Sequence, residues 1–528
     1  MTLVKTEMRN KISNLYSLLF ALIMTFYISV NYSLDNAPGK LPISTNAICN
    51  GLFFFIIGKL IYYFLKLLFN HIKDTSLKKP VYKKSDSRYF LIVFAITLAS
   101  YVITLLALYP GVFHYDSSYQ LDAMVINGAY SEFHPLIHTL YLELFYNLGH
   151  VIGSYTVSMA ISNLIQCIAF AIVVSYLHLF LKRMEMNKYL RYFFIFLFAF
   201  MPYCKILAVS ATKDTFFSMF VLLFFIMLAY KETDIDYFNR PFHKFLFVFS
   251  VVNVCLWRNN GKYLILPAIA VCIYEFIKHK QYALRFLVMT LIGFVMAVII
   301  GKGMKYSLDA EDISIKEMLS VPVQQLGYTY NHYDITEADK DALLYCIPNI
   351  DAYNAHLSDN LKDTIETHFN FIYFTKIWMR HGLRHPIAYI KAELYLVEGY
   401  LNIADRSSSL IYGDFLPGYL QLDVVPGFGI CRDSKIKALE NYYYTMYSDN
   451  YYFYNPLLRL LCQPSFYMWI ILFSLCYIWE YRKNLSYILP LLAYILTLFL
   501  GPCVLIRYAL PYILVVPIIM MIVPLDNK

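Results

Sequence analysis

The sequence predicts an all-α, polytopic membrane protein with about twelve transmembrane helices. Hydrophobic residues make up 59% of the 528 residues, charged residues make up only 15%, and the mean hydropathy is +0.51. Apolar runs of roughly 20 residues, the length that crosses a bilayer, recur along most of the chain. A soluble core seldom needs even one such run, so the composition argues against a set of soluble domains.

Residues 1–88 are predicted to hold two spans and a basic loop. Three basic residues precede an apolar run from Ile12 to about Tyr32. This run is too long for the apolar part of a signal peptide, and its cleavage pattern is weak, so we expect a retained span. The second span runs from Ile48 to Phe69. The loop after it is basic, and by the positive-inside rule it is cytoplasmic, which also places the N-terminus in the cytoplasm.

Residues 89–301 are predicted to form the transmembrane core. Its first span, Tyr89 to Leu108, runs outward and leads into an exterior loop of residues 110–154. A Pro-Gly pair at the start of this loop breaks the helix and turns the chain along the membrane interface. The segment from Leu136 to Val151 has a polar stripe on one face and leucines on another, so we expect it to lie in the outer interface without crossing.

Nine further spans complete the predicted topology. Because the segment from Leu136 does not cross, the next span carries Lys182, Arg183 and Lys188 to the cytoplasm, in agreement with the positive-inside rule. Residues 302–465 are mostly polar and are predicted to form an exterior domain, and residues 466–528 hold the last three spans. The nine spans are 155–181, 192–209, 215–230, 245–257, 263–277 and 286–300, with three more that begin near 466, 485 and 503.

The predicted topology brings charged residues that are distant in sequence to the outer membrane surface. A carboxylate near several cations suits a reaction between an acidic lipid-linked group and a hydroxyl acceptor. The cations would hold the phosphate and neutralise the leaving group, and the carboxylate would take the acceptor proton. Charges at a membrane edge are costly and therefore suggest function. The residues concerned are Asp116, His134, Lys213, Asp214, Arg258 and Arg507.

The acidic residues and the lysine also have structural explanations. Asp116 could cap a helix that starts near the following residue, in which case Asp122 is another candidate in the same loop. Lys213 and Asp214 could form a local pair at a helix start, where the helix dipole favours the carboxylate. These explanations stay open beside the catalytic one.

The histidines and arginines have structural explanations too. His134 precedes a proline that can start a helix, so it could be a packed, hydrogen-bonded side chain. His134 and His138 are four residues apart and could ligate a metal, but no clear third ligand accompanies them. Arg258 and Arg507 could extend towards lipid headgroups.

Several short motifs of this chain resemble those of a known family. With these motifs, the chain from about Tyr89 to the C-terminus resembles a family of functionally uncharacterised GT-C-like membrane proteins, known mainly from Gram-positive bacteria. More distantly, it resembles GT-C glycosyltransferases such as the protein O-mannosyltransferases and the lipid A aminoarabinose transferases. The motifs are Pro110-Gly111 with Asp116 and Gln120, His134-Pro135, Lys213-Asp214, Arg258-Asn259-Asn260-Gly261, Val321-Pro322-Val323-Gln324-Gln325 and Arg507-Tyr508-Ala509-Leu510-Pro511.

The resemblance implies a GT-C-like fold and a sugar donor on a polyprenyl phosphate, with inversion at the anomeric carbon. Asp116 would match the acidic base of the first exterior loop. Better-known relatives often have two adjacent acids there, whereas here the neighbour is Ser117, so no cofactor is firmly implied, although a divalent cation would be compatible. Residues implied in binding the donor phosphate or the substrate are Gln120, His134, Lys213, Asp214, Arg258, Asn259, Asn260, Gln324, Gln325 and Arg507.

We therefore expect a membrane glycosyltransferase that transfers a hexose or pentose to an envelope glycan, glycolipid or protein. The expected partners are the lipid-linked donor, the acceptor and the bilayer, and no nucleic acid. The expected location is the cell membrane, with the active site outside the cytoplasm. Two alternatives stay open: a transporter or flippase of lipid-linked saccharides, which would place ionisable residues near the middle of the membrane, and a non-catalytic envelope scaffold.

Overall fold

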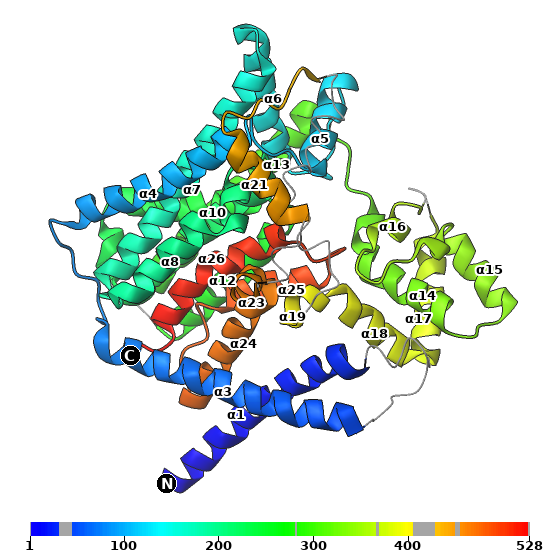
Figure 1. Ribbon diagram of the computed structural model, residues 1–528, viewed down its shortest axis with the longest axis horizontal. Helices are drawn as coiled ribbons and strands as arrows, with labels where there is room; N and C mark the ends of the chain where they lie inside the picture. Colours follow the sequence, from blue (N-terminus) through cyan, green and yellow to red (C-terminus); the bar gives the residue numbers. More distant parts are fainter. Residues whose placement is uncertain are drawn as a thin grey trace.

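The structure is a bundle of apolar helices with a smaller helical lobe attached (Figure 1). The computed structural model describes residues 2–30, 45–279, 282–365, 369–404, 428–448 and 455–525. Within these ranges the regular structure is helical, and the few β-bridges are isolated. Among the described residues, seven helices are long and apolar enough to cross a membrane, or nine if each of two bent pairs counts as one span. The chain is therefore a multi-pass membrane protein.

The apolar helices coincide with the segments predicted as spans. Seven are long, and three more are shorter: α11 (Pro241–Leu256), α25 (Leu489–Phe499) and α26 (Ile506–Ile522). The long ones are α1 (Thr2–Thr25, continued by η1, Phe26–Val30), α3 (Thr45–Thr75), α4 (Asp86–Ala107), α7 (Tyr155–Arg183), α10 (Lys213–Thr233), α12 (Lys262–Ile277) and α13 (Ala283–Leu308).

The two bent pairs each break directly before a proline. Helix α8 (Lys188–Phe200) meets α9 (Pro202–Ala208) at 50°, and α23 (Pro456–Cys462) meets α24 (Pro464–Tyr481) at 66°. A proline has no N–H to donate and disfavours a helical conformation in the residue before it, so each helix stops there and a new one starts at the proline.

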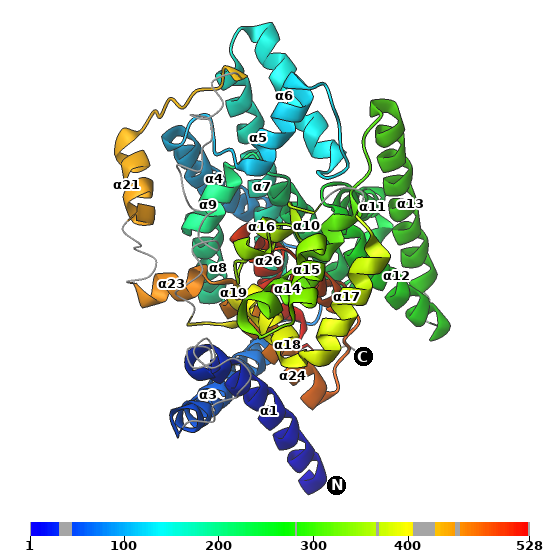
Figure 2. The same cartoon turned by 90° about the vertical axis from the view of Figure 1, so that its right-hand side faces the viewer.

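Helices α10 and α26 lie at the centre of the bundle. The sequence of α10 is apolar on every side, which predicts a buried position, and nearly all of its side chains are buried. It packs against α7, α11 and α26. The surrounding helices α3, α4, α12 and α13 expose large apolar side chains on their outer faces, as expected of helices that face lipid. Figure 2 shows α13 along one edge of the bundle, beside α11 and α12.

The loop predicted to follow the first core span lies at one end of this bundle. It contains α5 (Tyr115–Leu121), which continues as η2 (Asp122–Ile126), and α6 (Leu136–Ile152), which packs on α7. The predicted helix from Leu136 to Val151 is thus confirmed, and α6 is not one of the described helices that pass as a membrane span.

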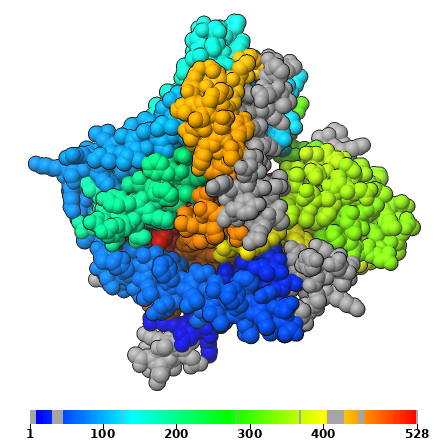
Figure 3. All heavy atoms as spheres, in the orientation of Figure 1, coloured from blue at the N-terminus to red at the C-terminus, as the bar shows by residue number. Residues whose placement is uncertain are grey.

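The segment predicted as one exterior domain divides into two parts. One part is the lobe in Figure 1, formed by α14 (Ser320–His332), α15 (Glu337–Cys346), α17 (Phe371–Arg384) and α18 (Pro386–Leu396) around a separate hydrophobic core. The other part, with α21 (Lys437–Ser448), packs against α4, where the Tyr443 and Thr104 hydroxyls are 3.0 Å apart. Figure 3 shows this part, in orange, on the surface of the bundle.

Candidate functional site

Five charged side chains from four segments meet beside the N-terminal end of α10. Lys213, the first residue of α10, forms an ion pair with Asp116 of α5. Asp214 is completely buried and pairs with Arg258, whose Nη1 lies 2.8 Å from Oδ1. Arg507 of α26 joins the two acids, because its Nε lies 3.5 Å from Asp214 Oδ2 and its Nη2 lies 3.6 Å from Asp116 Oδ1. We call these five residues the charged network.

Backbone hydrogen bonds hold the two loops that carry this network against each other. The Val112 N–H donates to the Val209 carbonyl oxygen at 2.9 Å, and the Val112 carbonyl accepts from the Ala211 N–H at 2.8 Å. The first loop leads into α5 and the second into α10. Their pairing therefore places Asp116 and Lys213 side by side, although 97 positions separate them in the sequence.

Two glycines allow the backbone to approach closely at the site. Gly111 has a φ of +132°, and a Cβ there would lie 2.0 Å from Asn163 Nδ2. A Cβ on Gly261, three residues after Arg258, would lie 1.8 Å from the carbonyl oxygen of Val254. Only glycine fits either position, because the nearest atoms belong to a buried side chain and to backbone.

The surrounding charges and burial fix the ionisation of Asp116 and of the neighbouring His134. Burial opposes ionisation of Asp116, but Lys213 and Arg507 outweigh it and hold the pKa of this carboxyl well below its usual range. Burial, reinforced by Lys213, lowers the pKa of His134 to about 3. The imidazole is therefore neutral at physiological pH, and its Nδ1 accepts a hydrogen bond from Lys213 Nζ at 3.3 Å.

The network has one positive charge in excess, because three cations face two carboxylates. Two of the three cations, Lys213 and Arg258, line a cavity of about 210 Å³. Asn259, Asn260 and Tyr508 also line this cavity. Such a cavity can accept an anion, since ammonium, guanidinium and amide groups all donate hydrogen bonds.

A second cavity, of about 160 Å³, adjoins the first and shares Pro135 and Asn259 with it. Glu132, His134 and Lys262 line part of it, and α11 and α13 contribute an apolar wall. Taken together, the two cavities combine cationic and amide side chains with one continuous apolar wall, which suits a ligand with a charged head and a hydrocarbon tail. The apolar wall consists of Leu256, Phe294, Ala297, Val298, Gly301 and Met304.

The structure brings most of the predicted site residues together. Besides the charged network and His134, the two asparagines after Arg258 belong here. Asn259 Nδ2 donates to the Glu132 carbonyl oxygen at 2.9 Å, and Asn260 Nδ2 donates to Thr497 Oγ1 at 3.0 Å. These bonds connect the 258–261 segment to the 110–154 loop on one side and to α25 on the other.

The three predicted glutamines make other contacts. Gln120 Nε2 donates to Thr139 Oγ1 at 2.7 Å, and its Oε1 lies 2.8 Å from His138 Nδ1, which joins α5 to α6. Gln324 Nε2 donates to the carbonyl oxygen of Asn354 at 2.8 Å, and Gln325 Oε1 accepts from Trp378 Nε1 at 2.7 Å, both inside the lobe. A direct part for these glutamines in substrate binding stays a prediction.

Sequence reasoning did not assign a role to two tyrosines of the site. The Arg258 guanidinium lies 4.2 Å from the ring centroid of Tyr508, and its Nη1 donates to the Tyr494 hydroxyl at 3.4 Å. Tyr494 falls within an uninterrupted apolar run, so nothing in the sequence distinguishes it. Tyr508 belongs to the Arg507 motif, and its position next to that arginine was the available signal.

In the part of the chain that the structure describes, no three His, Cys, Asp or Glu side chains are grouped as metal ligands would be. His138, which lies four residues after His134, contacts Gln120 and packs against Trp257, with ring centroids 6.0 Å apart.

Comparison with known proteins assigns the chain to a family. A family model matches residues 127–527, about three quarters of the sequence. The match begins after Asp116 and includes the other members of the charged network. No curated protein and no solved structure matches the chain. Since the match covers well over half of its length, the chain belongs to the family described as "Family of unknown function (DUF6020)".

Proposed function

We propose that this protein is a membrane glycosyltransferase of the GT-C type, which transfers a sugar from a polyprenyl-phosphate donor to a cell-envelope acceptor. The observation that carries the proposal is the pair of adjoining cavities beside the charged network. A polyprenyl-phosphate sugar has the matching shape and chemistry, because it joins an anionic, hydroxyl-rich head to a long hydrocarbon tail.

The polar cavity supplies what the donor phosphate needs. Lys213 and Arg258 face it, and the network carries one excess positive charge that a phosphodiester would neutralise. When the sugar leaves, the phosphate gains a second negative charge, and cations already in place stabilise that charge as it develops. The hydrocarbon tail of the donor would lie along the apolar wall of α13.

Asp116 is the proposed general base. It is held ionised by Lys213 and Arg507, so it can accept a proton. A bound phosphate would compete for Lys213, and the loss of that contact raises the basicity of Asp116. The carboxylate then takes the acceptor hydroxyl proton, the hydroxyl oxygen bonds to the anomeric carbon, and the bond from that carbon to the phosphate oxygen breaks. Polyprenyl phosphate leaves with the electron pair, and the anomeric configuration inverts.

The distribution of basic residues supports an extracytoplasmic site. The loop before α4 packs on the far end of α7, where the Val81 N–H donates to the Arg183 carbonyl at 2.9 Å and Lys182 and Arg183 both pair with Asp86. This basic end lies a full membrane span away from the charged network, so the positive-inside rule assigns it to the cytoplasm. A transporter would place its charges near mid-membrane, whereas this network lies at one end of α10.

The test compares two acids of the same loop. Asp116→Asn should change the envelope glycans as deletion of the protein does, while Asp122→Asn, at an exposed position, should leave them as in the parent. The purified Asp116→Asn protein should still bind polyprenyl phosphate, because Lys213 and Arg258 remain. Unchanged glycans in Asp116→Asn cells with normal protein levels would refute the role of this acid.

A further inference from the structure

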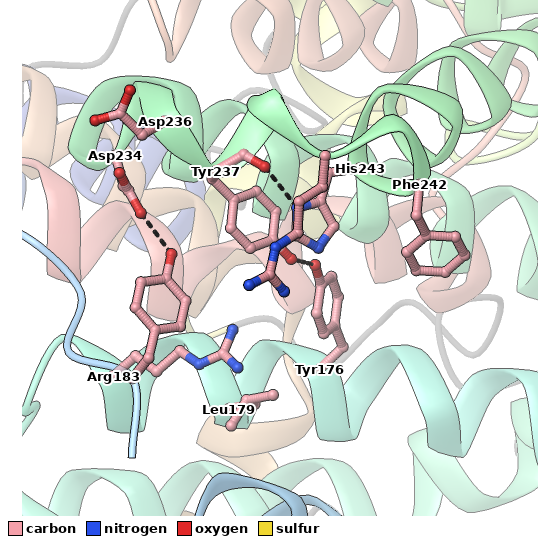
Figure 4. Close-up of a pocket in the computed structure, with 10 residues that line it drawn as sticks. Tyr176, Leu179, Arg183, Asp234, Asp236, Tyr237, Phe242 and His243 are labelled. Carbon is pink, nitrogen blue, oxygen red and sulfur yellow. Dashed lines mark hydrogen bonds between the residues drawn. The ribbon is translucent and has the colours of Figure 1, made fainter. Parts of the chain in front are cut away.

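A third cavity lies at the opposite end of α10 from the charged network and has no part in the proposed transfer. It has a volume of about 350 Å³ and lies between the C-terminal end of α7 and the segment from Asp234 to the start of α11 (Figure 4). Helix α10 has 21 residues, so at about 1.5 Å per residue it separates the two sites by about 30 Å. That distance is the thickness of a bilayer's hydrocarbon core, so this cavity lies at the other membrane surface.

One wall of the cavity is held rigidly. The ring of Tyr237 stacks between the rings of Tyr230 and His243, at centroid distances of 3.9 and 3.5 Å. Arg183, on α7, donates from Nε to Asp86 at 2.8 Å and from Nη1 to the Tyr230 hydroxyl at 3.0 Å. The charge of Arg183 is therefore already satisfied, and the recognition of a ligand falls to the other charged residues of the lining.

Those residues are a cation and two acids without ionic partners. Arg240 is exposed and forms no ion pair within the described residues. Asp234 accepts a hydrogen bond from the Tyr82 hydroxyl, and Asp236 accepts one from Asn239 at 3.2 Å, but neither pairs with a cation in the described part of the chain. Figure 4 shows the two carboxylates together at one end of the cavity, and Phe242 at the other.

The end with Phe242 opens towards lipid. The Phe242 side chain is 63% exposed, and Phe245 and Phe249, at the helical spacing that places them on the same face of α11, are exposed as well. An apolar path therefore leads from the cavity along α11 into the membrane.

We propose that this cavity binds the headgroup of an aminophospholipid such as phosphatidylethanolamine. The lipid phosphate would pair with Arg240, the ammonium group with Asp234 and Asp236, and an acyl chain would lie along α11. A purely anionic headgroup would leave the two carboxylates unpaired beside it, so the charge pattern favours the zwitterion. This site is independent of the proposed transfer reaction.

Native mass spectrometry of the full chain, released from nanodiscs with equal amounts of phosphatidylethanolamine and phosphatidylglycerol, tests this proposal. The parent protein should retain phosphatidylethanolamine preferentially. Arg240→Gln and Asp236→Asn should each lower that retention by about tenfold, as expected for loss of a charge-assisted contact. Lys278→Gln, at an exposed position at the end of α12, is the matched control and should not change it.

Three results would overturn the proposal: equal retention of phosphatidylglycerol, unchanged retention in both variants, or displacement of the lipid by soluble phosphoethanolamine, which would assign the cavity to a free solute. Both variants replace exposed side chains, so their thermal unfolding midpoints should match the parent and exclude misfolding as a cause. Asp116→Asn should retain the lipid fully, which separates this test from that of the transferase.

Discussion

Removing the charge of Asp214 should destabilise the protein more than any other single change in the charged network. Asp214 is fully buried and contacts two guanidinium groups, of Arg258 at 2.8 Å and of Arg507 at 3.5 Å. Asp214→Asn preserves the shape of the side chain, so the effect is electrostatic and leaves three cations facing only Asp116. Removal of one partner from a buried ion pair costs about 3–5 kcal/mol, and we expect a loss in that range.

Arg258→Gln should cost less, about 2 kcal/mol, because Arg507 still contacts the acid. The double variant should lose less than the sum of the two single losses, by about 1–3 kcal/mol, since both remove the same contact. The assay is denaturant unfolding in detergent micelles, followed by tryptophan fluorescence. Asp312→Asn is the control. The Asp312 side chain, which pairs with Lys305, is 84% exposed, so this substitution should change the stability by less than about 0.5 kcal/mol. A loss that small for Asp214→Asn, or strict additivity, would refute the reasoning.

Three further perturbations test the geometry of the site. Gly261→Ala should destabilise the protein by several kcal/mol, because the new Cβ would collide with the Val254 carbonyl. Gly303→Ala should be neutral or stabilising in a thermal melt, because a Cβ there would meet no neighbouring part of the described structure within 4 Å. The pKa of His134 is lowered to about 3 in the folded protein but is about 6.5 in the unfolded chain. As the pH falls below about 6.5, the unfolded chain therefore takes up a proton at His134 that the folded protein does not, and the stability should fall. His134→Asn should flatten that dependence by about 1 kcal/mol per pH unit, and equal slopes in unfolding experiments would contradict the assignment. Gly301→Leu should fill the apolar cavity and weaken binding of long-chain polyprenyl phosphate severalfold, while a short-chain analogue binds as before; equal effects on both would argue against a tail site.

The helices could be predicted from the sequence because their lengths and their basic flanks are imposed by the bilayer itself. Each of the two helix breaks comes directly before a proline, Pro202 or Pro464, so the sequence contains a local signal for both. The packing of residues 428–448 against α4 could not be predicted from the sequence, because it depends on long-range contacts such as the hydrogen bond from the Lys435 N–H to the Leu106 carbonyl at 2.8 Å. Nothing local in a polar, tyrosine-rich segment distinguishes such docking from membership of the neighbouring lobe.

The members of the site could be predicted better than their pairing. Asp116, Lys213 and Arg258 each lie next to the predicted outer end of a different span, so the topology alone places them on one membrane surface. Which carboxylate meets which cation depends on side-chain reach and on the bridge at Val112, which no periodicity reveals. Gln324 lies in a polar motif, but its hydrogen bonds run to the backbone of its own lobe, and a sequence motif does not distinguish such a bond from ligand binding.

The most direct test of the transferase proposal is a cryo-electron microscopy structure of the protein in nanodiscs with a polyprenyl-phosphate sugar analogue. Our account predicts that the phosphate lies within hydrogen-bond distance of Lys213 and Arg258, that the tail follows the apolar wall of α13, and that the anomeric carbon faces Asp116. A phosphate bound at the opposite end of α10, or a sugar out of reach of Asp116, would contradict it.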